Sequence, residues 1–425
     1  MVPSDDTPAA SGLRGREVST PGLGQSLERI GARFSAEGAL GILLLDASSF
    51  AEIERVYGFE AHLQAVNQLA VLVLEAVKSR LDPLDLVLRG ETGRNEVLVL
   101  VFRPHDQARF DMEEIPALRK AILKGLARQG SRLAYPYVKQ APPVHLGTTV
   151  ALRNPTIGVE TQVRCALEDA RADARLSLEI SERERRRRFV EIILKEQISC
   201  VYEPIVDVKR KTVHGYEALA RGPEGSEFHS PIALFKMAEQ EGLVFQLDCL
   251  CRSKALEGAR GRARATKLFL NILPTTVHDP SFRPEVLSRT LDEHDLHPSE
   301  VVFEISERES IDNFTIFREV RDYYRKLGFQ FALDDTGAGY SSLQSVMELA
   351  PEYIKVDRAL VTGIDVDPTR QELLRALHSV AGRIRARIIA EGLETLEELS
   401  MLAELGIPFG QGWLFGKPTP LRAKG

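Results

Sequence analysis

The adjacent carboxylates Asp334 and Asp335 follow a short apolar run and precede the glycine-containing segment Thr336–Gly339. This order predicts a buried strand that ends in two acids, followed by a loop able to close over a ligand. A second short strand is predicted at Tyr353–Val356, after a helix-length segment. Strand, loop, helix and strand form the unit of a parallel α/β sheet or barrel, where chemistry is found at the carboxyl ends of the strands.

One acid pair alone would indicate an ordinary turn, because Asp side chains bond nearby backbone groups. From Cys200 onward, however, successive predicted strands end in polar residues: Glu217, Asn271, Glu304, Asp334 with Asp335, Lys355, Glu391 and Gln411. Charges at the ends of buried strands are costly unless they are paired or bind metal. Oxygen ligands without His or Cys indicate two Mg²⁺ or Mn²⁺ ions rather than zinc, and two such ions suit phosphodiester hydrolysis. The nearby His214 and His378 are not expected to be ligands.

Composition excludes several classes of protein. The chain has 425 residues, 44% of them hydrophobic and 27% charged, with a net charge of −6. These values are typical of a globular protein of two or three domains and do not favour nucleic-acid binding. No apolar stretch is long enough to span a membrane, and no secretory signal is recognised, so we expect a cytoplasmic protein. The four cysteines, Cys165, Cys200, Cys249 and Cys251, are expected to be reduced and mostly in the core.

Four regions are predicted along the chain. They are a disordered leader at 1–25, an α+β domain at 26–180 with a mostly antiparallel central sheet, a connecting helix at 181–198 and an α/β domain at 199–421. In the first domain, patterning predicts strands at 41–46, 86–89, 97–102 and 144–152, and helices at 49–77, 115–126 and 161–180, with a break at Tyr57-Gly58. Arg185–Arg188 is interleaved with acids, which favours a solvated helix face over a basic binding patch.

The first domain resembles the GGDEF domain of diguanylate cyclases. Leu45-Asp46-Ala-Ser-Ser-Phe50 matches the family's first metal-binding strand end, and Gly93-Arg-Asn-Glu-Val97 matches its signature. Arg94 and Asn95 replace a glycine and an acid of that signature, and Ala51, Glu54 and Arg55 replace the residues around the guanine site. Asp46 and Glu96 alone do not rebuild a metal site, so the resemblance implies a degenerate, inactive module that regulates its neighbour by binding GTP or a protein. An unrelated α/β domain is the alternative.

The second domain resembles the EAL domain of cyclic di-GMP phosphodiesterases, whose fold is a modified TIM-type (β/α) barrel. Glu217-Ala-Leu219 is the motif that names the family. By this resemblance, Glu217, Asn271, Glu304 and Asp334 would hold one metal ion, and Asp334, Asp335 and Glu391 the other. Lys355 would position the attacking water, and Glu391 is a candidate general base. The resemblance also implies that Leu219, Arg221 and Gln411 bind substrate and that Glu307 supports the Asp-Asp loop. It further implies that the protein forms a homodimer.

Three residues depart from the family pattern. Thr336 and Ala338 replace Phe and Thr in the loop after the two aspartates, and Glu203 replaces a common Gln. We therefore expect a metal-dependent hydrolase that opens cyclic di-GMP to linear pGpG in bacterial signalling, and we carry a receptor that binds without cutting as the alternative. Two further alternatives are a scaffold and a phosphodiesterase of another substrate.

Overall fold

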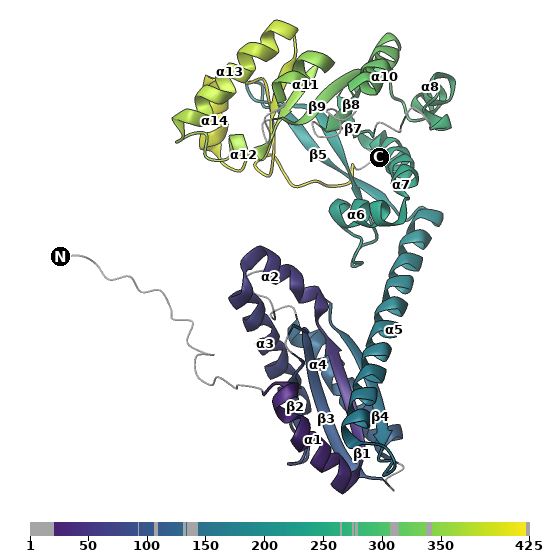
Figure 1. Cartoon of the computed structure of the whole chain (residues 1–425). Helices are drawn as coiled ribbons and strands as arrows, with labels where there is room; N and C mark the ends of the chain where they lie inside the picture. The colour runs from purple at the N-terminus through teal and green to yellow at the C-terminus, as the bar shows by residue number, and fades with distance from the viewer. Residues whose placement is uncertain are drawn as a thin grey trace, which may run out of the picture. The chain divides into compact units, whose positions relative to one another are not determined.

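The computed structural model describes residues 21–91, 93–105, 109–130, 133, 143–263, 266–273, 276, 279–306, 314–336 and 342–421. The chain divides into two compact units, Met1–Glu184 and Arg185–Gly425 (Figure 1). Within the described ranges, no helix combines the length and the apolar character that crossing a bilayer requires.

The first unit is built on a four-stranded antiparallel sheet in the order β2-β3-β1-β4. Its strands are β1 (Gly38–Asp46), β2 (Leu86–Arg89), β3 (Glu96–Pro104) and β4 (His145–Leu152). Alternate residues of β1 face opposite sides of the sheet and enter two separate cores. The α+β class and the antiparallel sheet predicted for this region are confirmed.

Helices cover both faces of this sheet (Figure 1). One core includes residues of α3 (Phe59–Val77) and α4 (Ile115–Gln129), and the other includes residues of α1 (Leu23–Glu37) and α5 (Val159–Leu194). A 3₁₀ turn (Ser48–Phe50) and α2 (Ala51–Tyr57) precede α3, and a π-helical turn (Phe110–Glu114) precedes α4. The break predicted at Tyr57-Gly58 separates α2 from α3, where Gly58 has a φ of 88°.

Two expectations need correction. The predicted leader ends too late, because α1 starts at Leu23 and buries that side chain; residues 1–20 lie outside the described part. The buried face of α1 has few hydrophobic side chains, because Ser26 and Gly31 occupy buried positions. The hydrophobic pattern of the sequence therefore does not indicate where this helix starts. The connecting helix is the end of α5 and stops at Leu194, before Glu196 adopts a φ of 50°.

The cysteine prediction holds only in part. All four cysteines are free thiols, but Cys165 is exposed on α5, and Cys200, Cys249 and Cys251 are half-buried rather than fully in the core. Burial raises the pKa of Cys200, Cys249 and Cys251 to about 12. These three thiols are therefore poor nucleophiles near neutral pH.

The second unit is a closed eight-stranded barrel in the order β10-β11-β12-β5-β6-β7-β8-β9, which confirms the predicted barrel. β5 is antiparallel to both neighbours, and the other strands run parallel. The strands are β5 (Ser199–Asp207), β6 (Val213–Arg221), β7 (Lys267–Asn271), β8 (Val301–Ser306), β9 (Gln330–Thr336), β10 (Tyr353–Val356), β11 (Arg387–Ala390) and β12 (Phe409–Gln411).

Helices connect the barrel strands along the chain (Figure 1). They are α6 (Pro231–Glu241), α7 (Val244–Gly258), α8 (Pro284–Glu293), α10 (Phe314–Lys326), α11 (Ser342–Leu349), α12 (Arg358–Val361), α13 (Pro368–Ile384) and α14 (Leu396–Glu404), with 3₁₀ turns at Ala259–Gly261, Pro280–Phe282 and Pro298–Glu300. A large core cluster packs barrel residues such as Phe303 and Ile388 against this layer, for example against Leu374 of α13.

The barrel interior is filled below the strand ends by a second cluster that includes Phe269, Tyr353 and Phe409. His214 closes the opposite end: its Nε2 lies 2.9 Å from Tyr353 Oη, and its ring stacks on Phe409 at 4.0 Å between centroids. Arg387 also contacts the Tyr353 hydroxyl and lies over its ring. Because the interior is packed, polar chemistry is confined to the carboxyl ends of the parallel strands.

Candidate active site

Lys355 stands at the centre of the acidic residues at the strand ends. Its Nζ lies 3.1 Å from Glu217 Oε2, 3.0 Å from Glu304 Oε1, 3.1 Å from Asp334 Oδ1 and 2.8 Å from Glu391 Oε1. The four carboxylates come from β6, β8, β9 and the residue after β11. The barrel therefore gathers in one place residues that are up to 174 positions apart.

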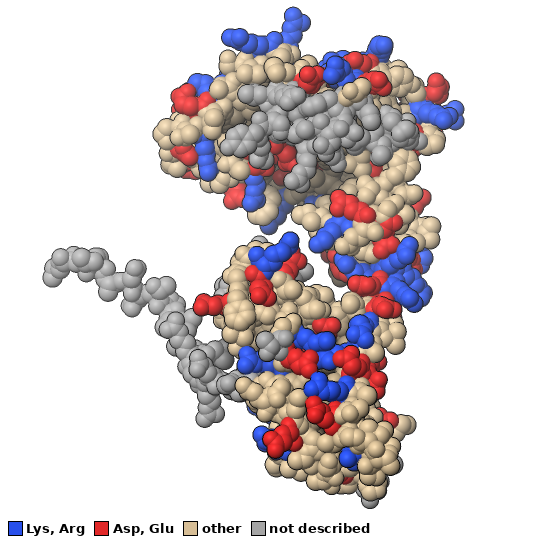
Figure 2. Space-filling model, viewed as in Figure 1, with Lys and Arg blue, Asp and Glu red and all other residues tan. Residues whose placement is uncertain are grey.

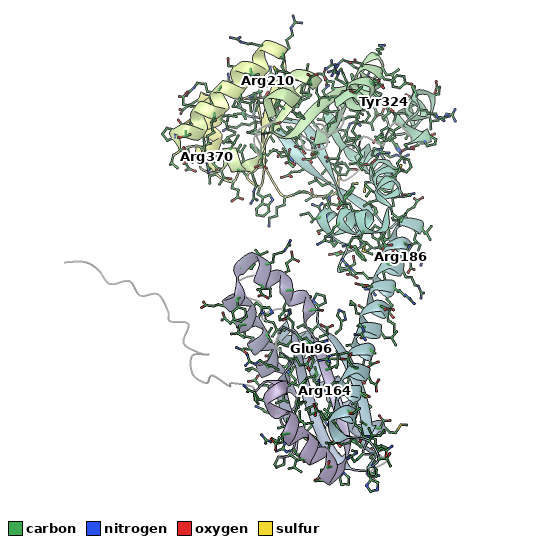
Figure 3. All side chains as sticks on the ribbon, viewed as in Figure 1. Glu96, Arg164, Arg186, Arg210, Tyr324 and Arg370 are labelled. Carbon is green, nitrogen blue, oxygen red and sulfur yellow. The ribbon has the colours of Figure 1, made fainter. Side chains whose placement is uncertain are left out.

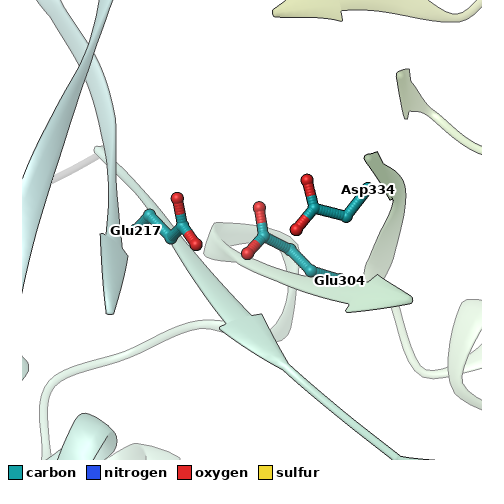
Figure 4. Close-up of side chains that lie close together, drawn as sticks. All are labelled: Glu217, Glu304 and Asp334. Atoms are coloured by element: carbon teal, nitrogen blue, oxygen red, sulfur yellow. The ribbon is translucent and has the colours of Figure 1, made fainter. Parts of the chain in front are cut away.

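The carboxylates form two groups whose oxygen atoms could share an ion. One is Glu217, Glu304 and Asp334, and the other is Asp334, Asp335 and Glu391; within each group the ligand atoms all lie within 4.8 Å of one another. In Figure 4 the carboxylates of Glu217, Glu304 and Asp334 converge from three strands. Asp334 belongs to both groups.

Glu304 provides the observation that tests whether these residues fit a cation. Its side chain is fully buried, Lys355 Nζ lies 3.0 Å from Oε1, and Oε2 has no hydrogen-bond partner among the described residues. A buried carboxylate with an unsatisfied oxygen is costly, and a hard divalent cation would satisfy it. The donor set therefore fits a hard divalent cation.

Burial and mutual charge shift the pKa values of these groups. Burial raises the pKa of Glu304 well above its usual range, and the Glu217 charge adds to that rise. Burial also raises the pKa of Glu391 well above its usual range, although Lys355 opposes it. For Glu217, burial is outweighed by Lys355 and by hydrogen bonds, so its pKa is lowered. The surrounding carboxylates likewise outweigh burial at Lys355 and raise its pKa, which keeps the ammonium charged.

Gln411 joins this cluster through its amide nitrogen. Nε2 donates to Glu217 Oε2 at 2.6 Å and to Glu203 Oε2 at 3.1 Å, so both amide hydrogens are used. Its Oε1 is buried and has no hydrogen-bond partner among the described residues. Burial raises the pKa of Glu203, and the Gln411 hydrogen bond opposes that rise. From the sequence, Glu203 was expected only to repel an anionic ligand. Its hydrogen bond with Gln411 was not predicted.

The remaining predicted residues lie around the cluster. Asn271 Nδ2 is 3.4 Å from Glu217 Oε1. Asp335, inside β9, has a left-handed backbone conformation with a φ of 57°. Leu219 is half-buried on β6, where it pairs with Val201. Glu307 and residues 337–341, including Ala338, lie outside the described residues.

Arg221 is not brought into the acidic cluster. Its Nη1 donates to the carbonyl oxygen of Ala220 at 2.8 Å, and it forms no ion pair with a carboxylate in the described part of the chain. Neither histidine considered from the sequence lies in the cluster, because His214 bonds Tyr353 and His378 Nδ1 bonds the Leu405 carbonyl oxygen at 3.2 Å.

Of the two acids singled out in the first unit, Glu96 is paired with an arginine. Asp46 and Glu96 face each other across β1 and β3, and both oxygens of Glu96 accept hydrogen bonds from Arg171 of α5 at 2.9 Å. Glu96 is labelled beside α5 in Figure 3. Asp46 Oδ1 accepts from the Ser48 backbone. This bidentate buried ion pair gives Glu96 a structural role that does not require a metal ion.

Arginines of the connecting segment are also paired. Arg185 and Arg188 contact Glu227, and Arg186 lies 2.7 Å from Glu241 of α6. The interpretation as a helix face with compensated charge is consistent with these ion pairs. Their partners, however, are Glu227 and Glu241 of the same unit rather than the interleaved acids of the helix.

Comparison with known proteins gives concordant results for the second unit. The family model described as EAL domain matches residues 184–418, more than half of the chain. The chain is 33% identical over 229 residues to the probable cyclic di-GMP phosphodiesterase PdeG of Escherichia coli K12, covering 51% of this chain and 44% of that protein. It is 25% identical over 423 residues to the cyclic di-GMP phosphodiesterase NbdA of Pseudomonas aeruginosa, covering 97% of this chain and 52% of that protein.

A solved structure supports the fold. The EAL enzyme Bd1971, in a form bound to cAMP and cyclic di-GMP, aligns with a TM-score of 0.51 at 24% identity, over 66% of this chain and 80% of that chain. The chain spans about half the length of the curated relatives that it matches.

Proposed function

Because the chain belongs to the EAL domain family, we propose that its second unit hydrolyses cyclic di-GMP to linear pGpG with two divalent ions, Mg²⁺ or Mn²⁺. The observation that carries this proposal is the convergence of four strand-end carboxylates on Lys355, with contacts of 2.8 to 3.1 Å. Several relatives named as cyclic di-GMP phosphodiesterases support the choice of substrate.

In this proposal the metal ions supply Lewis-acid stabilisation of the phosphodiester and lower the pKa of the attacking water. Glu217, Asn271, Glu304, Asp334, Asp335 and Glu391 are the residues that would hold them. The reaction adds one water molecule: its oxygen bonds to phosphorus, one P–O ester bond breaks, and the leaving oxygen takes up a proton.

Protein groups position the reactants. Lys355 donates toward Glu391 at 2.8 Å and fixes that carboxylate, which we assign as acceptor of the water proton. Gln411 is held by Glu203 and Glu217, and it presents its carbonyl oxygen as the remaining polar atom. Arg221, at the end of β6, is assigned to the substrate phosphate, which requires its side chain to leave the Ala220 carbonyl.

A single-turnover incubation with cyclic di-GMP and Mn²⁺ tests the proposal, with products separated by chromatography. We expect pGpG in wild type, none after chelation, and a loss of at least about a hundredfold in Glu217→Gln. Glu372→Gln is the matched control, because Glu372 is an exposed carboxylate on α13 paired with Arg375. Intact cyclic di-GMP in the wild-type reaction, or equal rates in both variants, would exclude the assigned role.

A receptor that binds cyclic di-GMP without cutting it is the second candidate. Thr336 favours it, because this residue replaces the family's Phe, is fully buried, and leaves Oγ1 without a hydrogen-bond partner in the described structure. Equilibrium dialysis separates the two functions: a receptor retains cyclic di-GMP intact in the presence of Mn²⁺. Two further points stay predictions. The first is a homodimer, which sedimentation tests. The second is regulation of the barrel by GTP or a protein bound to the first unit, which is tested by adding GTP to the hydrolysis assay.

A further inference from the structure

A groove in the first unit lies between the end of α3 and the length of α4. Its lining contains one acid, Glu75, and five cationic residues: Lys78, Arg80, Lys120, Lys124 and Arg128. Cations thus outnumber the acid by four in a chain whose net charge is −6. On the face shown in Figure 2, by contrast, basic and acidic side chains are interspersed. The groove therefore differs from that face in its charge.

These cations are not explained by the folding of the unit. None of the five forms an ion pair with a residue that the structure describes. Lys120, Lys124 and Arg128 recur at four-residue spacing, so like charges are neighbours on one face of α4, which destabilises a helix. The negative end of a helix dipole attracts cations such as Lys78 and Arg128, but Lys120 and Lys124 lie more than one turn before the end of α4 at Gln129.

The two helices approach each other closely where small side chains line the groove. A Cβ atom at Gly125 would lie 3.1 Å from Ala76 Cβ and 3.3 Å from Leu72 Cδ2. Ala117 and Ala121 also line the groove, together with the longer cationic side chains. The cavity has a volume of about 620 Å³, which is within the range of small-molecule sites.

We propose that this groove binds a small anion carrying two or more phosphates, such as inorganic triphosphate or the phosphate chain of a nucleoside triphosphate. Closely spaced cations recognise phosphate oxygens through charge-assisted hydrogen bonds, and Ser79 adds a hydroxyl donor. By this proposal, a nucleotide acting on the first unit would bind between α3 and α4, and not at Glu96 of β3, which is paired with Arg171.

Isothermal titration of the full chain with inorganic triphosphate tests this site. The protein and buffer are depleted of metal, so that phosphate binding through ions at the barrel does not contribute. Lys120→Gln/Lys124→Gln removes two groove charges, and both residues are exposed, so the fold is retained; thermal melting verifies this. The control, Arg55→Gln/Arg164→Gln, removes two exposed charges of the same unit that are paired with Glu52 and Glu160.

We expect the groove variant to bind triphosphate at least about tenfold more weakly than wild type, while the control changes about twofold or less. Binding that weakens as salt increases, with GTP and ATP binding as tightly as triphosphate, supports recognition of the phosphates alone. An equal loss in both variants, nucleotide binding that survives in the groove variant, or no binding by wild type at millimolar triphosphate overturns the proposal. None of these outcomes depends on hydrolysis of cyclic di-GMP.

Discussion

Replacing Lys355 with Met removes the charge that holds the acidic cluster together while keeping a side chain of similar length. Four carboxylates lie within 3.1 Å of Nζ. At an effective dielectric constant of about 20, one such contact is worth about 5 kcal/mol, and the desolvation of the ammonium offsets much of the sum. Breaking a buried ion pair typically costs about 3–5 kcal/mol, and we expect that loss of unfolding free energy here.

Urea denaturation in the presence of a chelator measures this loss. Mn²⁺ should then restore part of the stability of Lys355→Met and should stabilise it more than it stabilises wild type, because the ions would replace the missing positive charge. Lys254→Met is the matched control: Lys254 contacts Glu196 and Glu257 at 3.1 Å on the surface, where ion pairs contribute about 0–1 kcal/mol.

A loss below about 1 kcal/mol in Lys355→Met would refute the reasoning, because it would mean that the carboxylates do not need the lysine to stay buried. Equal stabilisation of both proteins by Mn²⁺ would refute the link between the lysine and the cation sites. Activity alone does not distinguish these cases, since the variant is expected to be inactive under either account.

Three further changes test other parts of the structure. Arg171→Met removes both hydrogen bonds that Arg171 donates to the buried Glu96 carboxylate and leaves it the longer ion pair with Arg94, at 3.7 Å, so the unfolding free energy of the first unit should fall by about 3 kcal/mol in urea. Glu96→Gln in the same background should recover part of this loss. Gly412 has a φ of 150°, and Gly412→Ala would place Cβ 2.3 Å from Leu393 backbone atoms. We therefore expect this variant to lose about 2–4 kcal/mol of unfolding free energy and most of its hydrolytic activity. Burial lowers the pKa of His214 from 6.5 to about 4, so the unfolded chain binds this proton more readily and stability declines as pH falls from 6.5 to 4. His214→Phe should flatten that decline in urea midpoints, and an unchanged slope would contradict the assignment.

Much of the barrel and of the cluster could be predicted because both depend on local patterns. Apolar runs that end in acids predict buried strands, and parallel strands bring their carboxyl ends to one side of a barrel. The sequence alone therefore predicts that Glu304 and Asp334 lie close together. The start of α1 could not be predicted in the same way. Its buried positions include Ser26 and Gly31, which carry no hydrophobic signal, and only tertiary packing explains their burial.

Long-range polar pairs were beyond local patterns for a different reason. Arg171 and Glu96 are 75 residues apart, and neither segment signals its partner. Read alone, Glu96 looked like a surviving acid of a degraded metal site. In the structure, Glu96 is paired with Arg171 of α5. Once this partner is known, Glu96 is explained as half of a structural ion pair.

Glu203 shows how a departure from a family pattern changes meaning in context. A carboxylate beside an anionic substrate would repel it if its charge were free. Here Glu203 accepts a hydrogen bond from Gln411, 208 residues away, and Gln411 gives its other amide hydrogen to Glu217. With both hydrogens committed, Gln411 has only its carbonyl oxygen left, which is an acceptor for a cation, water or a substrate N–H group. The substitution at position 203 therefore acts on the site through the orientation of Gln411, in addition to its own charge.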